Sequence, residues 1–334
     1  MKVGKLNWDD LKEIISSNKS VDRKDVRIKS GVGEDCSVIE FGDFECIVST
    51  DPITGAESDI GKLAVNINCN DIASCGVEPV GILVTILAPE QTTLDELKAV
   101  MKEIDEECKK LNVEILGGHT EVTRAVNKLI VSCTAIGKGK KGIAVATSGA
   151  KIEDDIIVTK NLAMEGTSII VNDYFQFIKD IISTEEAKEV KTYIKNISVV
   201  DEGIIAGNFG VNSMHDITEG GVLGALWEMA DASNVGFRVY KDKLPLSIVT
   251  KKICNKLKID PLRFISSGSM LITTKNGSEL IKELNKKGIK AAVIGNITKD
   301  KGILVDDKGL EIEVKPPERD ELFSLAELIM NNNN

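Results

Sequence analysis

The chain has 334 residues, of which 42% are hydrophobic, 28% are charged and only 4% are aromatic, and its formal net charge is −10. This length is enough for about two domains with a large core, and the negative charge argues against general binding to nucleic acids or anionic membranes, because like charges repel. No signal peptide or membrane-spanning segment is evident, and the seven dispersed cysteines form no CxxC pair, so we expect a cytoplasmic protein with reduced thiols.

The first half of the chain alternates predicted strands with predicted helices. A short helix over 6–17 is followed by a charged connector over 21–30, which we expect to be exposed. Gly42 and Asp43 form the turn of a hairpin, because they separate two apolar runs. The other predictions are strands over 37–41, 45–50, 80–87, 113–116 and 128–136, a central helix over 59–75 that ends at Gly76, and a helix that begins with the capping box Thr93 to Glu96 and extends to 111.

The lysine- and glycine-rich piece over 137–149 is the predicted domain boundary, because it lacks periodicity and precedes a fresh strand. We therefore expect an N-terminal domain over 1–148 and a C-terminal domain over 149–334. In the second half, a loop over 214–221 leads into a helix that ends near 232. The other predictions are strands over 155–160, 236–240, 269–274 and 291–297, a hairpin over 302–315, and helices over 162–173, 184–195, 199–208, 246–257, 277–287 and 318–330.

The central helix carries polar side chains although its pattern is that of a buried element. Asn68 and Asp71 fall on one stripe of this helix, whereas Asn66 and Asn70 point in nearly the opposite direction. A buried amide or carboxylate without partners costs roughly a few kcal/mol. The sequence therefore predicts that Asn68 and Asp71 are satisfied by a ligand, by a metal ion or by an internal hydrogen-bond network.

Four carboxylates sit in loops or near helix ends, where polar side chains converge, namely Asp35, Asp51, Asp71 and Asp216. Hard oxygen ligands of this kind suit Mg²⁺, which binds through a few carboxylates and takes its other ligands from phosphates and water. Two loops, over 117–120 and 218–221, combine glycines with small side chains and allow backbone amides to approach a phosphate. The chain has neither a GxxxxGK[ST] loop nor a GxGxxG fingerprint after a strand, which argues against the commonest nucleotide-binding folds.

Seven segments that occur in the same order over nearly the whole chain resemble the AIR synthase-related (PurM-like) superfamily. They are GEDCSVI, STDPITG, DIGKLAVNINCNDIASCGVEP, ILGGHTEVT, HDITEGGVLGALWEMA, ISSGSMLITT and VIGNIT. The first half is most similar to hydrogenase maturation factors of the HypE type, and thiamine-monophosphate kinase and selenophosphate synthetase are other relatives. The resemblance implies an α/β fold with an N-terminal domain that dimerises and a C-terminal domain whose sheet is covered by helices. It also implies that ATP binds in the cleft between the domains, near the dimer interface.

The matched motifs imply roles for individual residues. Mg²⁺-ATP ligands are implied at the four aspartates named above, and Asn68 is expected to orient a phosphate or a metal-bound water. Contacts with phosphate or substrate are implied for Gly117, Gly118, Thr120, Gly220, Gly221, Ser267 and Gly268. The candidates for direct participation in catalysis are Asp71, His119 and Asp216.

The chain departs from the HypE pattern in its tail and in one loop. HypE-type proteins end in a cysteine that receives a carbamoyl group, which ATP-dependent dehydration turns into a thiocyanate, whereas the last cysteine here is Cys254 and the chain ends in four asparagines. We therefore do not expect it to dehydrate its own tail. His119 stands where HypE and the kinase have an aspartate. In this position the chain resembles selenophosphate synthetase instead. Cys36 follows Asp35, and because a neighbouring carboxylate disfavours the thiolate, we expect a core thiol there.

The resulting hypothesis is an ATP- and Mg²⁺-dependent, HypE-like enzyme that activates an amide, thioamide or similar oxygen of a separate substrate by phosphoryl transfer. A small-molecule kinase resembling thiamine-monophosphate kinase is the alternative enzyme, and a nucleotide-binding regulator or assembly factor is the alternative without turnover. We expect a homodimer that binds ATP and a small-molecule or protein-borne substrate. A maturation partner protein is compatible with this hypothesis. We expect no nucleic-acid partner and no membrane partner.

Overall fold

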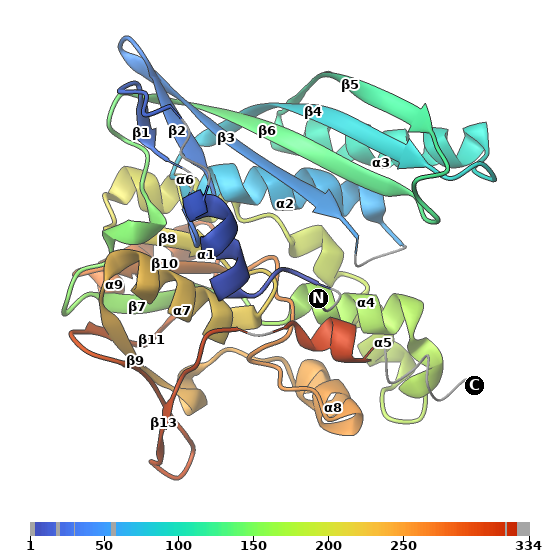
Figure 1. Cartoon of the computed structure of the whole chain (residues 1–334). Coiled ribbons are helices and arrows are strands. Elements are labelled where there is room, and N and C mark those ends of the chain that lie inside the picture. Colours follow the sequence, from blue (N-terminus) through green and yellow to red (C-terminus); the bar gives the residue numbers. More distant parts are fainter. Residues whose placement is uncertain (1–3, 18–20, 30, 55–57, 318, 326–334) are drawn as a thin grey trace.

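The structure is a computed structural model that describes residues 4–17, 21–29, 31–54, 58–317 and 319–325. These residues form two sheets in separate layers, and a long helix, α2 (Ile60–Ser74), lies beneath the first sheet and faces the second layer (Figure 1). The first sheet uses strands up to Lys140, and the second uses strands from Asp155 onward. The predicted mixed α/β architecture is confirmed, whereas the division between residues 148 and 149 stays a proposal.

The first sheet is antiparallel except at one edge. Its strands follow the order β1-β2-β3-β6-β4-β5, and only the β4–β5 pair is parallel among the described strands. Along β6 every second side chain is buried, which is the period-two pattern of a strand with one covered face. Helices α2 and α3 (Leu94–Leu111) provide that cover, and α3 begins with the predicted capping box. The strands are β1 (Val26–Ile28), β2 (Ser37–Phe41), β3 (Phe44–Ile53), β4 (Glu78–Ala88), β5 (Glu114–Val122) and β6 (Ile130–Lys140).

Pairing with a neighbouring strand creates or extends a strand at three places in this sheet where the sequence predicted none, whereas most of the described connector is exposed as predicted and the domain boundary stays a proposal. The connector over 21–30 contains β1, which pairs with β2. The piece over 137–149 begins inside β6, which pairs with β3 as far as Lys140. The segment over 117–120 is not a loop but part of the edge strand β5. A glycine is required at position 118, because a Cβ there would lie 1.8 Å from the carbonyl oxygen of Val84 in β4.

Helix α2 is buried along its whole length and joins the two layers. It begins after Asp59, which makes no side-chain capping bond, and it ends close to Gly76, whose φ of +76° is the predicted left-handed stop. Helix α6 (Val200–Phe209) of the second half packs directly on α2, and a Cβ at Gly203 would lie only 2.0 Å from the carbonyl oxygen of Ala73. The helix with the predicted polar stripe therefore lies at the centre of the contact between the layers.

The second sheet follows the order β13-β12-β9-β11-β7-β10-β8 and is antiparallel except for the β9–β12 pair. The predicted loop over 214–221 begins as strand β8 instead, because these residues pair with β10 in the core. The predicted helix over 318–330 is helical over 321–325 but not at residues 319 and 320, and residues 318 and 326–330 lie outside the described residues. The strands are β7 (Asp155–Thr159), β8 (Ser213–Asp216), β9 (Gly236–Tyr240), β10 (Met270–Thr274), β11 (Ala291–Thr298), β12 (Gly302–Val305) and β13 (Glu311–Glu313).

Helices surround the second sheet, and most of them agree with the predicted ranges. The predicted helix over 184–195 is instead a short α-helix followed by a 3₁₀ turn. No helix in the described part of the chain is long and apolar enough to cross a membrane. The α-helices are α4 (Met164–Asp173), α5 (Thr184–Val190), α6, α7 (Gly221–Ser233), α8 (Ile248–Leu257) and α9 (Gly277–Lys286), and the 3₁₀ turns are η1 (Thr147–Gly149), η2 (Phe175–Phe177), η3 (Tyr193–Asn196) and η4 (Lys241–Lys243).

The first helix of the chain packs on the second half, although the sequence assigns it to the first. Helix α1 (Trp8–Ser17) lies against α7, with the ring centroids of Trp8 and Trp227 5.0 Å apart. Lys12 Nζ lies 2.9 Å from a carboxylate oxygen of Asp231. Because these contacts hold α1 on α7, the residues just before it are placed at the junction of the two layers (Figure 1).

Candidate active site

The four aspartates singled out in the sequence come together at the junction of the layers. Each is supplied by a different element, because Asp35 precedes β2, Asp51 lies in β3, Asp71 lies in α2 and Asp216 ends β8. Asp71 and Asp216 are 5% and 3% exposed. Burial, together with the charges of the other three aspartates, raises the pKa of Asp71 well above its ordinary value. All four carboxylates therefore lie within electrostatic reach of one another.

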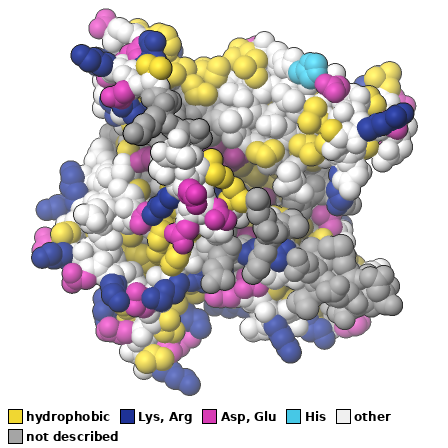
Figure 2. Space-filling view, in the orientation of Figure 1, with side chains coloured by type: hydrophobic (Ala, Val, Ile, Leu, Met, Phe, Trp, Pro, Cys, Tyr) yellow, Lys and Arg dark blue, Asp and Glu magenta, His cyan; other side chains and the backbone are white. Residues whose placement is uncertain are grey.

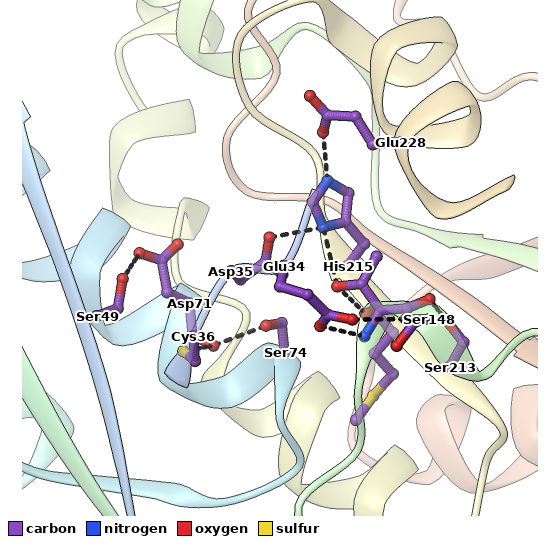
Figure 3. A network of polar contacts seen from close by, with 12 residues as sticks. Glu34, Asp35, Cys36, Ser49, Asp71, Ser74, Ser148, Ser213, His215 and Glu228 are labelled. Atoms are coloured by element: carbon purple, nitrogen blue, oxygen red, sulfur yellow. Dashed lines mark hydrogen bonds and ion pairs between the residues drawn. The ribbon is translucent and has the colours of Figure 1, made fainter. Parts of the chain in front are cut away.

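His215 is held between two carboxylates beside this cluster (Figure 3). Its Nδ1 lies 2.6 Å from Asp35 Oδ1, and its Nε2 lies 2.6 Å from Glu228 Oε2. Burial disfavours the charged ring, but Asp35 and Glu228 together hold the pKa of His215 well above its ordinary value. Burial likewise opposes ionisation of Glu228, but Lys5 and His215 lower the pKa of this carboxyl to about 2. Since both ring nitrogens face carboxylates, His215 is the cationic centre of a buried triad that positions Asp35.

Two buried carboxylate oxygens in the cluster lack a partner of ordinary hydrogen-bond geometry among the described residues. They are Asp35 Oδ2 and Asp216 Oδ2. One ligand atom from each of Asp35, His215 and Asp216 lies within 4.8 Å of the others. Buried charged oxygens are normally paired, so two unpartnered oxygens on residues whose ligand atoms converge in this way suit a hard cation of the Mg²⁺ type. Both ring nitrogens of His215 already contact carboxylates, so a cation at this site would be bound by oxygen atoms alone.

Asp71 is anchored by contacts from β3 and from its own helix (Figure 3). The hydroxyl of Ser49 donates to Asp71 Oδ2 at 2.5 Å, and the hydroxyl of Ser74 donates to the main-chain oxygen of Asp71 at 2.7 Å. The thiol of Cys36 also donates to that main-chain oxygen, at 3.0 Å. Burial raises the pKa of Cys36 well above its ordinary value, so this residue is a buried thiol, as predicted.

The asparagines of α2 belong to an internal network, the alternative that the sequence left open. Asn68 Oδ1 accepts the backbone N–H of Asp51 at 2.8 Å, and thus holds that aspartate in place. Asn70 accepts the backbone N–H of Val199 at 2.8 Å and ties α2 to the second half. Asn66 donates to the carbonyl oxygen of residue 62 within its own helix. A contact between Asn68 and a phosphate or a metal-bound water stays a prediction.

A cleft of about 410 Å³ opens beside the aspartates. Ser267, which the sequence singled out, lies in its lining beside Glu165 and is 1% exposed. Apolar side chains from both halves complete the walls. The lining residues are Gly4, Lys5, Asp51, Pro52, Ile53, Thr54, Ile67, Glu165, Thr218, Glu219, Ile265, Ser267, Leu322 and Phe323.

Lys5 contributes a positive charge to this cleft, and sequence reasoning missed it. Its Nζ lies 3.5 Å from Glu228, and its backbone N–H donates to Glu219 at 3.3 Å. The charge of Glu228, with further contributions from Glu219 and two of the aspartates, raises the pKa of Lys5 although burial opposes the shift. Its side chain is 51% exposed and faces the cleft. Nothing in the sequence around residue 5 signals this position, because only the packing of α1 on α7 creates it.

Glu165 and Glu228 were also missed, although each carries the signal that identified Asp71. Both are buried carboxylates in largely apolar helices and are 4% and 3% exposed, whereas the second acid of each helix, Asp173 in α4 and Asp231 in α7, is not buried. Burial raises the pKa of Glu165 to about 7. The rule that a buried carboxylate needs a partner therefore points to both positions.

The glycines predicted at the start of α7 have their amides engaged within the protein. The N–H of Gly220 donates to Asp320 Oδ2 at 2.8 Å, and the N–H of Gly221 donates to the carbonyl oxygen of Thr218 at 3.1 Å. Gly268 has a φ of +106°, which favours glycine for conformational reasons alone. Phosphate contacts of these three glycines stay predictions.

The segment Gly117, Gly118, His119 and Thr120 is not brought to the cluster within one chain. It lies in the edge strand β5, which β6 and β4 separate from β3 and Asp51. The side chain of His119 is 66% exposed, and its Nε2 lies 3.3 Å from Glu121. The predicted catalytic and phosphate-binding roles of this segment stay predictions, and they would require a second copy of the chain.

Curated proteins of similar sequence cover most of the chain. A hydrogenase expression/formation protein of Methanocaldococcus jannaschii is 30% identical over 319 residues, which cover 91% of each chain. Carbamoyl dehydratase HypE of Rhizobium leguminosarum is 24% identical over 82% of this chain and 79% of its own length. Thiamine-monophosphate kinase of Pyrococcus horikoshii is 27% identical over 82% and 85%, respectively. The expectation of an enzyme family agrees with these relatives, since the latter two are named for enzyme activities.

Solved structures show the same fold. The structure of a HypE–HypF complex superposes with a TM-score of 0.75 at 21% identity and covers 92% of this chain and 99% of that one. HypE in complex with ATP gives a TM-score of 0.69 at 18% identity and covers 92% and 90%. The predicted two-domain, PurM-like architecture is thereby confirmed.

Family models match both halves of the chain in the predicted order. The N-terminal domain of AIR synthase related protein matches residues 33–138, and the C-terminal domain matches residues 151–308. Together with the relative that is 30% identical over nearly the full length, these matches confirm the resemblance seen in the sequence. The chain belongs to the AIR synthase related protein family.

Proposed function

We propose that the chain is an ATP- and Mg²⁺-dependent enzyme that transfers a phosphoryl group to an amide, thioamide or similar oxygen of a separate substrate. The observation that carries this proposal is the cluster of four aspartates with two unpartnered buried oxygens at the edge of a cleft. Phosphoryl transfer depends mainly on positioning and on neutralising charge, which such a cluster provides once it holds cations. The names of the HypE and kinase relatives and the solved complex of HypE with ATP support it.

In this proposal each part of the site has a distinct task. Asp35, Asp71 and Asp216 hold Mg²⁺. Asp51, from strand β3, is the fourth carboxylate near the ion. The ion neutralises the phosphates and fixes their geometry. Lys5 faces the same space and adds a positive charge for a phosphate oxygen. His215 and Asn68 position Asp35 and Asp51 through the contacts described above.

A product assay tests the proposal against a kinase. The purified chain with Mg²⁺-ATP and a small thiocarbamate, S-carbamoyl-N-acetylcysteine, is expected to release ADP and free phosphate and to form the thiocyanate. ADP together with a phosphorylated acceptor, measured with thiamine monophosphate, would instead establish the kinase, which the 27% identical relative favours as the second candidate. Nucleotide binding without turnover under any of these conditions would support the regulator or assembly factor.

Metal and nucleotide should stabilise the protein. Without them, the free energy of unfolding should depend on pH, because several buried carboxyl groups have raised pKa values. Burial raises the pKa of Asp51 to about 6 and those of Glu165 and Asp320 to about 7, so the folded state binds protons more tightly than the unfolded state. The free energy of unfolding of the metal-free chain should therefore rise as the pH falls from 8 to 6. Glu228, with its pKa lowered to about 2, loses its contribution only in more acidic solution.

Thermal melts in EDTA and in Mg²⁺-ATP check this prediction. Saturating Mg²⁺-ATP is expected to raise the Tm and to reduce its pH dependence, because bound cations compensate the repulsion among the aspartates. A Tm that is unchanged by metal and nucleotide at every pH would contradict the proposed site.

We also propose that the chain acts as a homodimer through the uncovered face of the first sheet. Large apolar side chains on these strands remain exposed, including Phe44 at 46%, Leu83 at 41% and Leu116 at 51%. Figure 2 shows hydrophobic side chains gathered over this layer. Light scattering should give twice the chain mass, and Leu83→Glu should give the monomer, because it introduces a charge into an apolar contact. The HypE–HypF complex makes a maturation partner a further proposal.

A further inference from the structure

Glu34 precedes Asp35 in the chain, but its carboxylate is turned toward η1 and not toward the aspartates (Figure 3). Its Oε2 accepts the backbone N–H of Thr147 at 3.0 Å, and its Oε1 accepts the backbone N–H of Ser148 at 3.1 Å. Both partners lie in the crossover over 141–154, which links β6 to β7. Both oxygens of this carboxylate are therefore engaged with the crossover between the two halves.

Turn η1 has no cap from its own part of the chain. The residue before the turn is Ala146, and it makes no side-chain capping bond. The first N–H groups of a helical turn have no partner within the turn and need an acceptor from elsewhere. Glu34 supplies two acceptor oxygens from 113 residues away, and a charged acceptor makes stronger hydrogen bonds than a neutral one. The placement of η1 therefore depends on a side chain of the first half.

The other side of η1 is bound to the strand that carries Asp216. The hydroxyl of Ser213 donates to the carbonyl oxygen of Thr147 at 2.6 Å, and the hydroxyl of Thr147 donates to the carbonyl oxygen of Met214 at 3.3 Å. A Cβ at Gly149 would lie 2.0 Å from the carbonyl oxygen just before β8, so the turn approaches this strand as closely as a glycine allows. A shift of η1 would therefore move β8 with it.

The residues before and after this glutamate also contact the second half. Gly33 has a φ of +89°, and a Cβ there would lie 3.4 Å from the carbonyl oxygen of Glu228 in α7. Asp35 Oδ1 lies 2.6 Å from Nδ1 of His215 in β8. Three consecutive residues of the first half are thus held against the second half. Since Asp35 and Asp216 come from different halves, their separation depends on these contacts.

We propose that Glu34 is a positioning residue of the metal cluster, and that its contact with η1 fixes the separation at which Asp35 and Asp216 bind one cation. The inference rests on the proposed function, and it adds a residue that controls the metal affinity without contacting the ion. A site whose ligands must first be brought together binds more weakly, because ordering the ligands costs free energy. Glu34 orders them before the metal arrives.

Glu34→Gln tests the proposal with a side chain of the same length. The amide has one acceptor oxygen, and its NH₂ group would face a backbone donor, so one of the two hydrogen bonds is lost. Calorimetry on the full chain is expected to show an affinity for Mg²⁺ at least about fivefold weaker than in the wild type. A purely structural role would lower the Tm and the fraction of protein that binds, but it would leave the affinity unchanged. Equal affinities would overturn the inference.

The wild-type titrations separate this inference from the proposed function. Mg²⁺ is added to the free chain and to the chain that holds the β,γ-methylene analogue of ATP, and the variant is compared in a state in which the wild type binds. Absence of Mg²⁺ binding to the wild type in both states would contradict the proposed function itself. Binding that Glu34→Gln retains in full would leave the proposed function intact and overturn only the positioning role.

The matched control is Glu45→Gln, which loosens the same crossover away from the cluster. Glu45 is 1% exposed and accepts two backbone N–H groups of the crossover, at 3.1 and 2.7 Å. It lies toward the opposite end of β3 from Asp51, about 20 Å away along the strand. The control should lower the Tm at least as much as Glu34→Gln, but it should change the Mg²⁺ affinity less than about twofold.

A loss of affinity in Glu45→Gln as large as in Glu34→Gln would show that any loosening of the crossover weakens the site, and it would overturn the specific role of Glu34. If Glu45→Gln does not fold, Arg27→Lys replaces it, because this change disturbs the paired contact between Arg27 and Glu45.

Hydrogen exchange gives a readout that does not depend on comparing affinities. If Glu34 couples the crossover to the cluster, Mg²⁺ must in turn stabilise the crossover, because such coupling is reciprocal. Saturating Mg²⁺ is therefore expected to slow the exchange of the Thr147 and Ser148 amides in the wild type, and to slow it less in Glu34→Gln. Exchange at these amides that is unaffected by Mg²⁺ in the wild type would contradict the positioning role.

Discussion

Replacing Asp71 with asparagine is expected to reduce ATP turnover at least about 100-fold, which corresponds to a loss of about 2.7 kcal/mol of transition-state stabilisation. The asparagine side chain would keep the shape of the aspartate and a partner for the Ser49 hydroxyl, but it would remove the charge that Mg²⁺ requires. The same change should raise the Tm of the metal-free protein by about 2 °C or more, because it relieves repulsion within the buried cluster. Loss of activity and gain of stability in one variant distinguish a metal ligand from a structural residue.

The measurements are phosphate release and thermal melts in EDTA and in Mg²⁺-ATP. Asp95→Asn is the matched control, since this side chain is 93% exposed in the first turn of α3 and lies outside the cleft lining. It should change neither turnover nor the response to metal. If Asp71→Asn lowered the Tm in EDTA and kept its turnover, the carboxylate would serve the fold alone and the proposed metal cluster would be wrong.

Replacing His215 with alanine is expected to destabilise the protein by about 3–5 kcal/mol, because it leaves two buried carboxylates without their shared cation. Asp35 and Glu228 each lie 2.6 Å from the ring, and both would face each other across a cavity. The pKa of His215 is raised in the folded state, so its contribution is complete below its unfolded pKa of about 6.5 and is lost as the pH rises through the folded value. The difference from wild type should therefore be largest in mildly acidic solution.

Urea unfolding at several pH values measures this effect. His215→Gln retains a single donor and should fall between wild type and alanine, which keeps the prediction testable where the alanine variant does not fold. His119→Ala is the control, because this exposed side chain should change stability by less than about 0.5 kcal/mol. Equal stabilities of the two alanine variants would contradict the account of the buried triad.

Local patterns predicted most elements and missed those that depend on distant partners. The capping box of α3 and the left-handed stop at Gly76 are encoded within a few residues, and both are present. Strand β1 lies in a charged stretch without alternation and forms because β2 offers it a partner. The same reason makes β5 continue through the two glycines, which the sequence suggested as a phosphate-binding loop.

The sequence by itself determined the family and the candidate aspartates, because motif order and a carboxylate in an apolar helix are properties of the chain alone. Only the tertiary structure decided which polar groups meet. It brings Lys5 to Glu228 and His215 to Asp35, pairs that lie far apart in the sequence. Asn68 Oδ1 accepts a hydrogen bond from the backbone N–H of Asp51. Asp35 Oδ2 and Asp216 Oδ2, by contrast, have no hydrogen-bond partner among the residues that the structure describes. Whether a buried polar atom is satisfied internally or remains available to a ligand depends on long-range packing, and local sequence does not specify that packing.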